Sequence, residues 1–274
     1  MDCSMPVKMV TVGMIYDELN TLAPVHYQMD FDNSGFLVGD RDAEVKTVLT
    51  ALDITDAVIE EAAACSADLI ISHHPLLFHP LRNVLADDLT GRKVLTLARH
   101  GISAICMHTN LDIADGGVND TLMHTLKAEI TGLLEPAGTD DDGNPLGCGR
   151  IGYLTEAMPL NAFLRFITER LHVSGLRYCD SGKQVHKIAV CGGSGGSMLE
   201  LAYGAGCDTF VTADIKYDRF LAAKELGMNL IDADHFCTEN VVVPVIAQAI
   251  QDAFPDLEVM ISRALQQTTQ FYMP

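Results

Sequence analysis

The chain alternates between short apolar runs and longer segments with apolar residues at helical spacing. In the first half, β-branched and other apolar residues predict strands at 45–52, 68–72 and 102–107. Helical spacing lies between them, in the Ala-rich stretch 56–65 and in 91–100. This β-α-β order predicts an α/β fold with parallel strands, in which ligands bind beyond the carboxyl ends of the strands.

The second half resumes the alternation after a polar interval. Residues 131–149 are rich in glycine and include three successive aspartates, so we expect an exposed acidic loop that connects two similar α/β halves. The halves then span 1–130 and 150–274 and form one compact unit. Strands and helices are predicted at 150–155, 160–171, 175–179, 186–190, 198–204, 208–211 and 229–231.

Two histidines follow the strand at 68–72 directly. In the run Ser72-His73-His74-Pro75 the chain turns, because proline fixes its own φ and biases the residue before it away from helix. Two neutral imidazoles that converge on one point suit a divalent metal ion. Alternatively, one histidine caps the strand and the other is a solvated loop residue; the pair alone does not decide between these readings.

Two further polar clusters also follow apolar strands. After the strand at 102–107 come His108 and Asp112. Asp112 offers a carboxylate oxygen to a metal or forms a turn, and His108 is either a ligand or an acid–base group. After the last predicted strand, His235 and Glu239 are spaced i, i+4, so a helix there would place both on one face.

The three clusters together supply three imidazoles and two carboxylates, from His73, His74, Asp112, His235 and Glu239. One structural zinc ion needs only four ligands. Five ligands therefore favour two divalent metal ions with a bridging carboxylate and open positions for water, as in a catalytic centre. A mixed nitrogen and oxygen site accepts Zn, Mn, Fe, Co or Ni, so the sequence does not select the metal.

A glycine-rich loop follows a predicted strand of the second half. Residues 192–197 read Gly-Gly-Ser-Gly-Gly-Ser before a helix, so the backbone amides of Gly193, Ser194, Gly195 and Gly196 are candidates for binding a phosphate group. The loop matches neither a Walker motif nor the full dinucleotide-binding fingerprint. The alternative is a tight strand-to-helix turn that needs positive φ.

Composition narrows the choice of partners. The chain has 37 acidic and 18 basic residues, a formal net charge of −19, which disfavours nucleic acid and anionic membranes as partners. No stretch is apolar enough to cross a membrane, and the eight cysteines show no zinc-ribbon or C-x-x-C spacing, so we expect reduced thiols and a cytoplasmic protein. A hydrophobic content of 48% fits a homo-oligomer.

Six runs of residues resemble, in the same order, the motifs of the NIF-three-like family, also called GTP cyclohydrolase I type 2 homologues. They are FDNSGFLVGD (31–40), SHHPLLF (72–78), HTNLDIADGGVND (108–120), VCGGSGGS (190–197), TADIKYD (212–218) and DADHFCTEN (232–240). The resemblance implies two α/β halves with a dinuclear metal centre in the cleft between them, bound by the five residues above. It also implies a toroidal homohexamer and GTP, opened at its imidazole ring, as substrate.

The chain departs from the family pattern at three positions. Ala213 and Asp234 stand where glycine is common, and Asp218 stands where histidine is usual. None of these changes removes a metal ligand, although they alter the polar groups around the site. The predicted ligand set and the resemblance are compatible with two functions. One is a hydrolase in which metal-activated water attacks a small substrate and His108 donates a proton; the other is a non-catalytic metal-binding ring scaffold or regulatory protein.

Overall fold

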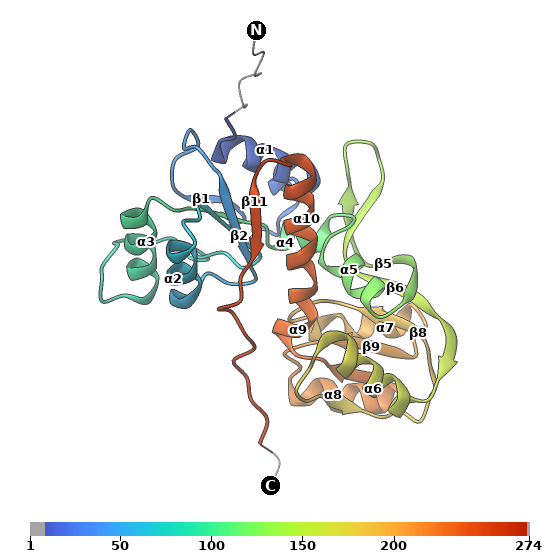
Figure 1. Ribbon diagram of the computed structural model, residues 1–274. Helices are drawn as coiled ribbons and strands as arrows, with labels where there is room; N and C mark the ends of the chain where they lie inside the picture. The colour runs from blue at the N-terminus through green and yellow to red at the C-terminus, as the bar shows by residue number, and fades with distance from the viewer. Residues whose placement is uncertain (1–8, 273–274) are drawn as a thin grey trace. The chain divides into compact units, whose positions relative to one another are not determined.

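The computed structural model describes residues 9–272, which form two compact units. Unit 1 comprises the described residues up to Asn110 together with Val243–Leu265, and unit 2 comprises Leu111–Val242 with the described residues from Gln266 onward. Each unit is built around its own mixed sheet with helices packed against it (Figure 1). The predicted α/β class is therefore confirmed, and the chain passes between the units more than once.

Unit 1 contains a five-stranded sheet in the order β1-β4-β3-β2-β11. Its strands are β1 (Gly35–Val38), β2 (Thr47–Ala51), β3 (Leu69–Ser72), β4 (Ser103–Cys106) and β11 (Glu258–Ile261). All pair in parallel except β1, which runs antiparallel to β4. The hydrophobic pattern predicts β2, β3 and β4, which are fully buried, but not the half-exposed edge strands β1 and β11.

Helices cover both faces of this sheet. On one face, α2 (Asp56–Ala64) and α3 (Leu89–His100) pack on side chains of β2, β3 and β4. Figure 1 shows α1 (Val12–Leu22) and α10 (Val243–Ala253) on the opposite face. The short 3₁₀-helix η1 (Val25–Tyr27) follows α1. Both faces of the parallel strands are thus buried, which accounts for the continuous apolar runs in their sequences.

Unit 2 contains a six-stranded sheet in the order β5-β6-β8-β9-β10-β7. Its central strands β8, β9 and β10 are parallel, and β5, β6 and β7 pair antiparallel with their neighbours. The strands are β5 (Ala128–Thr139), β6 (Pro145–Met158), β7 (Arg177–Cys179), β8 (Val185–Val190), β9 (Thr209–Thr212) and β10 (Asn229–Asp232).

The prediction of an acidic loop at 131–149 is wrong. Strands β5 and β6 occupy most of it and pair antiparallel from Ala128 opposite Leu154 to Thr139 opposite Pro145. Only residues 140–144 form the connecting turn. Beyond Leu134 every residue of β5 is exposed, so no alternation of polar and apolar positions marks this part of the strand. The chain passes from one unit to the other after Asn110, Val242 and Leu265, and not at the predicted boundaries of 130 and 150.

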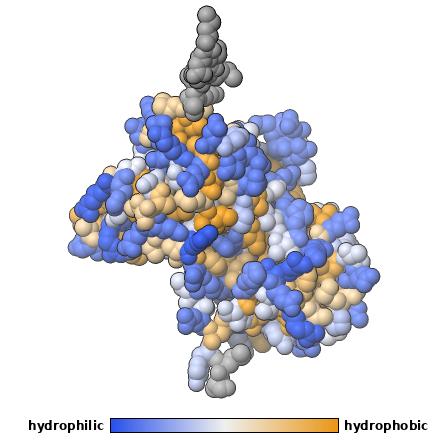
Figure 2. Space-filling model, viewed as in Figure 1, coloured by the Kyte–Doolittle hydropathy of each residue, from blue (hydrophilic) through white to orange (hydrophobic). Residues whose placement is uncertain are grey.

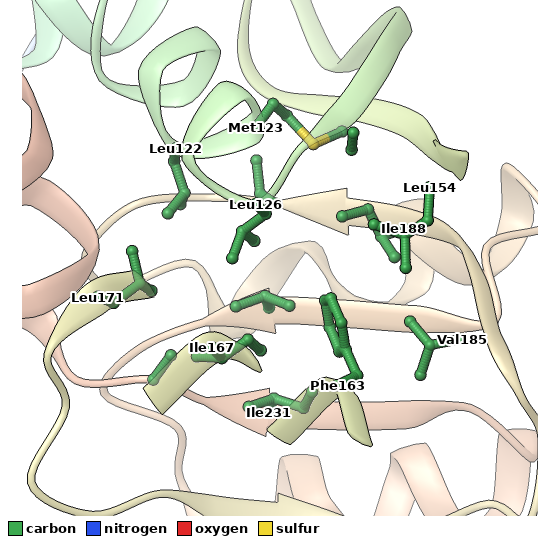
Figure 3. Close-up of a cluster of buried hydrophobic side chains, with 14 of the residues drawn as sticks. Leu122, Met123, Leu126, Leu154, Phe163, Ile167, Leu171, Val185, Ile188 and Ile231 are labelled. Atoms are coloured by element: carbon green, nitrogen blue, oxygen red, sulfur yellow. The ribbon is translucent and has the colours of Figure 1, made fainter. Parts of the chain in front are cut away.

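The core of unit 2 lies between its sheet and two helices. Figure 3 shows Leu122 and Leu126 of α5 (Val118–Thr125 and the turn after it) and Phe163 and Ile167 of α6 (Leu160–Leu171) among side chains of the strands. Burial of such side chains is the main stabilising contribution to a unit of this size. The remaining helices in the described part of unit 2, outside the candidate site, are α7 (Leu199–Gly204), α8 (Tyr217–Leu226) and the 3₁₀-helices η2 (Gly196–Met198) and η3 (Asn240–Val242).

A buried ion pair connects α5 to β6. Arg150 is 1% exposed, and its Nε and Nη2 atoms donate to Asp120 at 2.6 and 3.0 Å. Its Nη1 atom donates to the carbonyl oxygens of Gly147 and Gly149 at 2.8 and 3.1 Å. A buried guanidinium is stable only while these acceptors remain, because its desolvation is costly.

Two expectations from composition concern the state of the cysteines and the presence of membrane-spanning segments. The seven cysteines among residues 9–272 form no disulfide bonds, and Cys3 lies outside the described residues. Among residues 9–272, no helix combines the length and the apolar character that crossing a membrane requires.

We predict that Asp120→Ala lowers the free energy of unfolding by about 3–5 kcal/mol, because it leaves the Arg150 guanidinium buried without its counter-charge. Urea denaturation measures the loss. Asp115→Ala is the control: that carboxylate is 75% exposed and 3.5 Å from the same guanidinium, so its removal should cost less than about 1 kcal/mol. Equal losses in the two variants would contradict the prediction.

Candidate metal centre

Three histidines of unit 1 lie close together. His73 and His74 follow β3 directly, and His108 follows β4, the parallel neighbour of β3. All three therefore lie at the carboxyl ends of adjacent strands. Their ring centroids are 5.1 to 5.5 Å apart. One ring nitrogen of each lies within 4.8 Å of the other two. The predicted convergence of these side chains at the strand ends is confirmed.

Backbone hydrogen bonds form the turn that brings the adjacent histidines together. The amide of His73 donates to the carbonyl of Ala51 at 3.3 Å, and the amide of His74 donates to the carbonyl of Leu52 at 2.9 Å. The Ser72 hydroxyl donates to the carbonyl of His74 at 2.7 Å. Two neighbouring residues on a regular strand would point to opposite faces. Here the chain leaves the strand, and the two rings lie side by side.

Each of these imidazoles is held through its Nδ1 atom. The contacts are His73 with the carbonyl of Met107 at 2.7 Å, His74 with Asp53 at 2.8 Å and His108 with Asp32 at 2.7 Å. Carbonyl and carboxylate oxygens only accept, so in the neutral ring Nδ1 carries the proton and Nε2 carries the lone pair. Metal-binding histidines are oriented in this way in proteins.

Asp32 is the most extensively bonded of these acceptors. Its second oxygen accepts from the amide of Thr109 at 3.0 Å and from the Ser34 hydroxyl at 2.9 Å. Burial disfavours the charged carboxylate, but the hydrogen bonds from His108 and Thr109 outweigh it and hold the pKa of Asp32 well below its usual range. Sequence reasoning did not single out Asp32 or Asp53, since each lies far along the chain from the histidine that it orients.

Unit 2 brings the other predicted pair together. Helix α9 (His235–Glu239) follows β10, and the Nε2 atom of His235 lies 3.0 Å from Glu239 Oε2, one helical turn away. The Nδ1 atom of His235 lies 2.7 Å from Asp214 Oδ2. Burial disfavours the cationic ring, but hydrogen bonds with Glu239 and Asp214 raise the pKa of His235 to about 9. His235 is thus in contact with a carboxylate at each of its two ring nitrogens.

Asp112 lies on α4 (Thr109–Ile113), and its backbone carbonyl accepts from Asn119 Nδ2 at 2.9 Å. Both Asp112 and Glu239 lie near the buried thiol of Cys191. The neighbouring Cys148 thiol, burial and these two carboxylates together raise the pKa of Cys191 well above its usual range. Unit 2 therefore places both predicted carboxylates around one thiol.

The glycine-rich loop makes room for Glu239. Gly193 has φ of +62°, and a Cβ atom on it would lie 2.0 Å from Glu239 Oε1. Its amide donates to the Thr238 hydroxyl at 3.1 Å, and the amide of Gly195 donates to the Thr212 hydroxyl at 2.9 Å. The expected phosphate site is thus without these two donors, and phosphate binding stays a prediction for the amides of Ser194 and Gly196.

The three departures from the motif pattern lie in different surroundings. Buried Ala213 donates its amide to the carbonyl of Gly193 at 2.8 Å, which holds the glycine-rich loop. Asp218 is exposed and pairs with Arg219 at 3.2 Å. Asp234 begins α9 with φ of +70°, a conformation that favours glycine.

A family model described as Duf34/NIF3 (NGG1p interacting factor 3) matches residues 10–268. The chain belongs to the DUF34/NIF3 family. The resemblance inferred from the six sequence motifs is therefore confirmed.

Relatives and solved structures in this family match both units. Proteins called GTP cyclohydrolase 1 type 2 homolog are 34% identical over 259 residues in Clostridium perfringens and 35% identical over 236 residues in Clostridium acetobutylicum. The matches cover 94% and 86% of this chain and 98% and 87% of those proteins. The Staphylococcus aureus hypothetical protein SA1388 has a TM-score of 0.89 at 27% identity, covering 96% of this chain and 100% of its own. A Bacillus cereus protein related to NIF3 scores 0.88 at 26% identity, covering 97% and 100%.

We predict that Gly193→Ala displaces the Glu239 carboxylate and lowers the free energy of unfolding by about 1–3 kcal/mol, because it adds backbone strain at positive φ to a direct clash. Thermal unfolding measures the stability loss, and elemental analysis should show less bound metal. The control is Gly204→Ala, where a Cβ meets no atom within 4 Å. Metal content and stability in Gly193→Ala equal to those of the control would refute this account of the loop.

Proposed function

We propose that this DUF34/NIF3 protein is a hydrolase dependent on two divalent metal ions, with His73, His74, Asp112, His235 and Glu239 as ligands. The supporting observation is the orientation of the three histidines. Each has its Nδ1 atom against an oxygen of the chain, at 2.7, 2.8 and 2.7 Å. Such contacts fix the ring and select Nε2 as the nitrogen that would coordinate a metal ion.

The positions of the five residues along the chain support this ligand set. The chain leaves unit 1 after Asn110, which lies between His108 and Asp112, and returns to unit 1 at Val243, one turn beyond Glu239. Candidate ligands thus flank both crossings. Neither unit alone carries enough ligands for two metal ions, whereas the five together suffice.

The donor set fits such a centre. Three imidazole nitrogens and two carboxylates accept Zn, Mn, Fe, Co or Ni, and the acidic groups offset the charge of two divalent ions. When bound, the metal ions lower the pKa of a water molecule and make it a nucleophile at neutral pH. We assign proton transfer to His108. Because Asp32 fixes its Nδ1 atom, its Nε2 atom is where a proton is held and passed to the leaving group.

GTP is the first substrate to test. The relatives from two Clostridium species carry the name GTP cyclohydrolase 1 type 2 homolog, and opening the imidazole ring of a purine is a hydrolysis that an activated water can perform. A chain with a net charge of −19 has few other places to hold a triphosphate than beside bound cations. We place this activity in the cytoplasm, where thiols stay reduced.

The first prediction concerns metal content. Protein purified without chelators should hold two divalent metal ions per chain. His235→Ala should hold about one or none, because it removes one candidate ligand and the contact that this ligand makes with the Glu239 carboxylate. Elemental analysis measures both. The control is His186→Ala, an exposed histidine of unit 2, which should keep the full content. Absence of metal in the parent, with no uptake on reconstitution, would refute the proposal.

The second prediction concerns turnover. Metal-loaded protein mixed with GTP and with a cell metabolite extract should deplete one compound, and His74→Ala should abolish the depletion. His108→Gln should keep its metal while its rate falls about 10²- to 10⁴-fold, the usual contribution of an acid–base group. His100→Ala, in α3, is the control and should keep full activity. A parent that binds metal and depletes nothing would favour the non-catalytic scaffold.

We further propose that the chain forms a homo-oligomer, with the toroidal hexamer as the expected form. Unit 1 exposes large apolar side chains, among them Phe31 at 63%, Leu85 at 49% and Leu89 at 59%. Figure 2 shows hydrophobic areas among the hydrophilic surface of the molecule. Light scattering should return six times the chain mass of 29.7 kDa. A monomer mass at micromolar concentration would contradict this prediction.

A further inference from the structure

Asp234 begins helix α9 and determines how the helix starts. Its carboxylate accepts from the amide of Cys237 at 3.1 Å, so it caps the helix. Its carbonyl accepts from the amide and the hydroxyl of Thr238 at 3.0 and 2.9 Å. Since α9 has only five residues, this first turn carries or adjoins the two candidate ligands of the helix, His235 and Glu239.

The C-terminal segment supplies another donor to the same carboxylate. The side-chain amide of Gln267 donates to Asp234 Oδ1, and its carbonyl oxygen accepts from the amide of Thr269 at 2.8 Å. Further along, the ring of Phe271 lies against Gly175, where a Cβ atom would be 2.7 Å from it. The segment is therefore bound to unit 2 at two places.

Just before this segment, the chain is fixed to unit 1. The Glu61 carboxylate of α2 accepts from the Ser262 hydroxyl at 2.5 Å and from the amides of Arg263 and Ala264 at 3.0 and 3.2 Å. Partial burial of Glu61 disfavours its charge, but these hydrogen bonds outweigh that effect and lower its pKa. Gln267 thus follows, within three residues, a segment that is itself held in place.

We propose that Gln267 is a positioning residue for the metal site. By holding the Asp234 carboxylate, it keeps the first turn of α9, and with it His235 and Glu239, in the orientation that binds a metal ion. This inference rests on the metal-dependent function proposed above. An aspartate at positive φ is strained, so a cap held by two donors keeps the strained turn in place better than a cap held by one.

Cobalt binding by the full-length chain tests this role. Calorimetric titration with Co²⁺ should show about tenfold weaker binding in Gln267→Ala, at the low end of the loss seen when groups that orient metal ligands are removed. The visible spectrum of bound Co²⁺ should also change, because it reports ligand geometry. Gln270→Ala is the matched control: this glutamine is exposed, three residues further on, and its removal should leave affinity and spectrum unchanged. Gln267→Asn replaces the alanine variant if the latter does not fold.

A double variant distinguishes positioning from a general loss of stability. Asp234→Gly removes the carboxylate that Gln267 holds and relieves the strain at positive φ, so Gln267→Ala should then change cobalt affinity no further. Unchanged affinity in Gln267→Ala alone, or the same tenfold loss in the Asp234→Gly background, would overturn the positioning role while leaving the metal site intact. A parent chain that binds no cobalt would overturn the proposed function and this inference with it.

Discussion

The candidate site depends on oxygen atoms that hold histidine rings by their Nδ1 atoms. Met107, Asp53 and Asp32 do so in unit 1, and Asp214 does so in unit 2. An imidazole with a free choice of tautomer and ring angle binds a metal weakly, because binding must first select one arrangement. These acceptors make that selection during folding. The sheet places the histidines, and the acceptors decide which nitrogen each one offers.

In unit 2, steric fit as well as hydrogen bonding holds the candidate ligands in place. The missing side chain at Gly193 leaves space for the Glu239 carboxylate, and the hydroxyl of Thr238, which accepts from the Gly193 amide, links that loop to α9. Asp234 then caps the helix from its other side. A helix of five residues is marginal by itself. The contacts made by Gly193, Thr238 and Asp234 therefore contribute to its stability.

Sequence patterns predicted the elements that are buried on both faces and the candidate ligands that follow them. Strand β3 and the histidines after it are one continuous stretch, and His235 and Glu239 are separated by one turn, so local spacing contains the information. Asp53 and Asp32 could not be found in this way, since each reaches its histidine only through the tertiary fold. The hairpin of β5 and β6 was missed for the opposite reason: its exposed end buries no face and shows no period.

The glycine-rich loop lies where its spacing predicted, but two of its four candidate amides have partners within the chain. Its spacing favours bare amides, and those of Gly193 and Gly195 are indeed donors, but they donate to threonine hydroxyls of the chain. At position 193 glycine is required because the Glu239 carboxylate occupies the space that a Cβ atom would take. With a net charge of −19, a chain gains more from binding cations among its carboxylates than from building a separate anion site. In the proposed function, bound metal ions would offset the charge of an anionic substrate, so the residues that position the candidate ligands would also affect the affinity for that substrate.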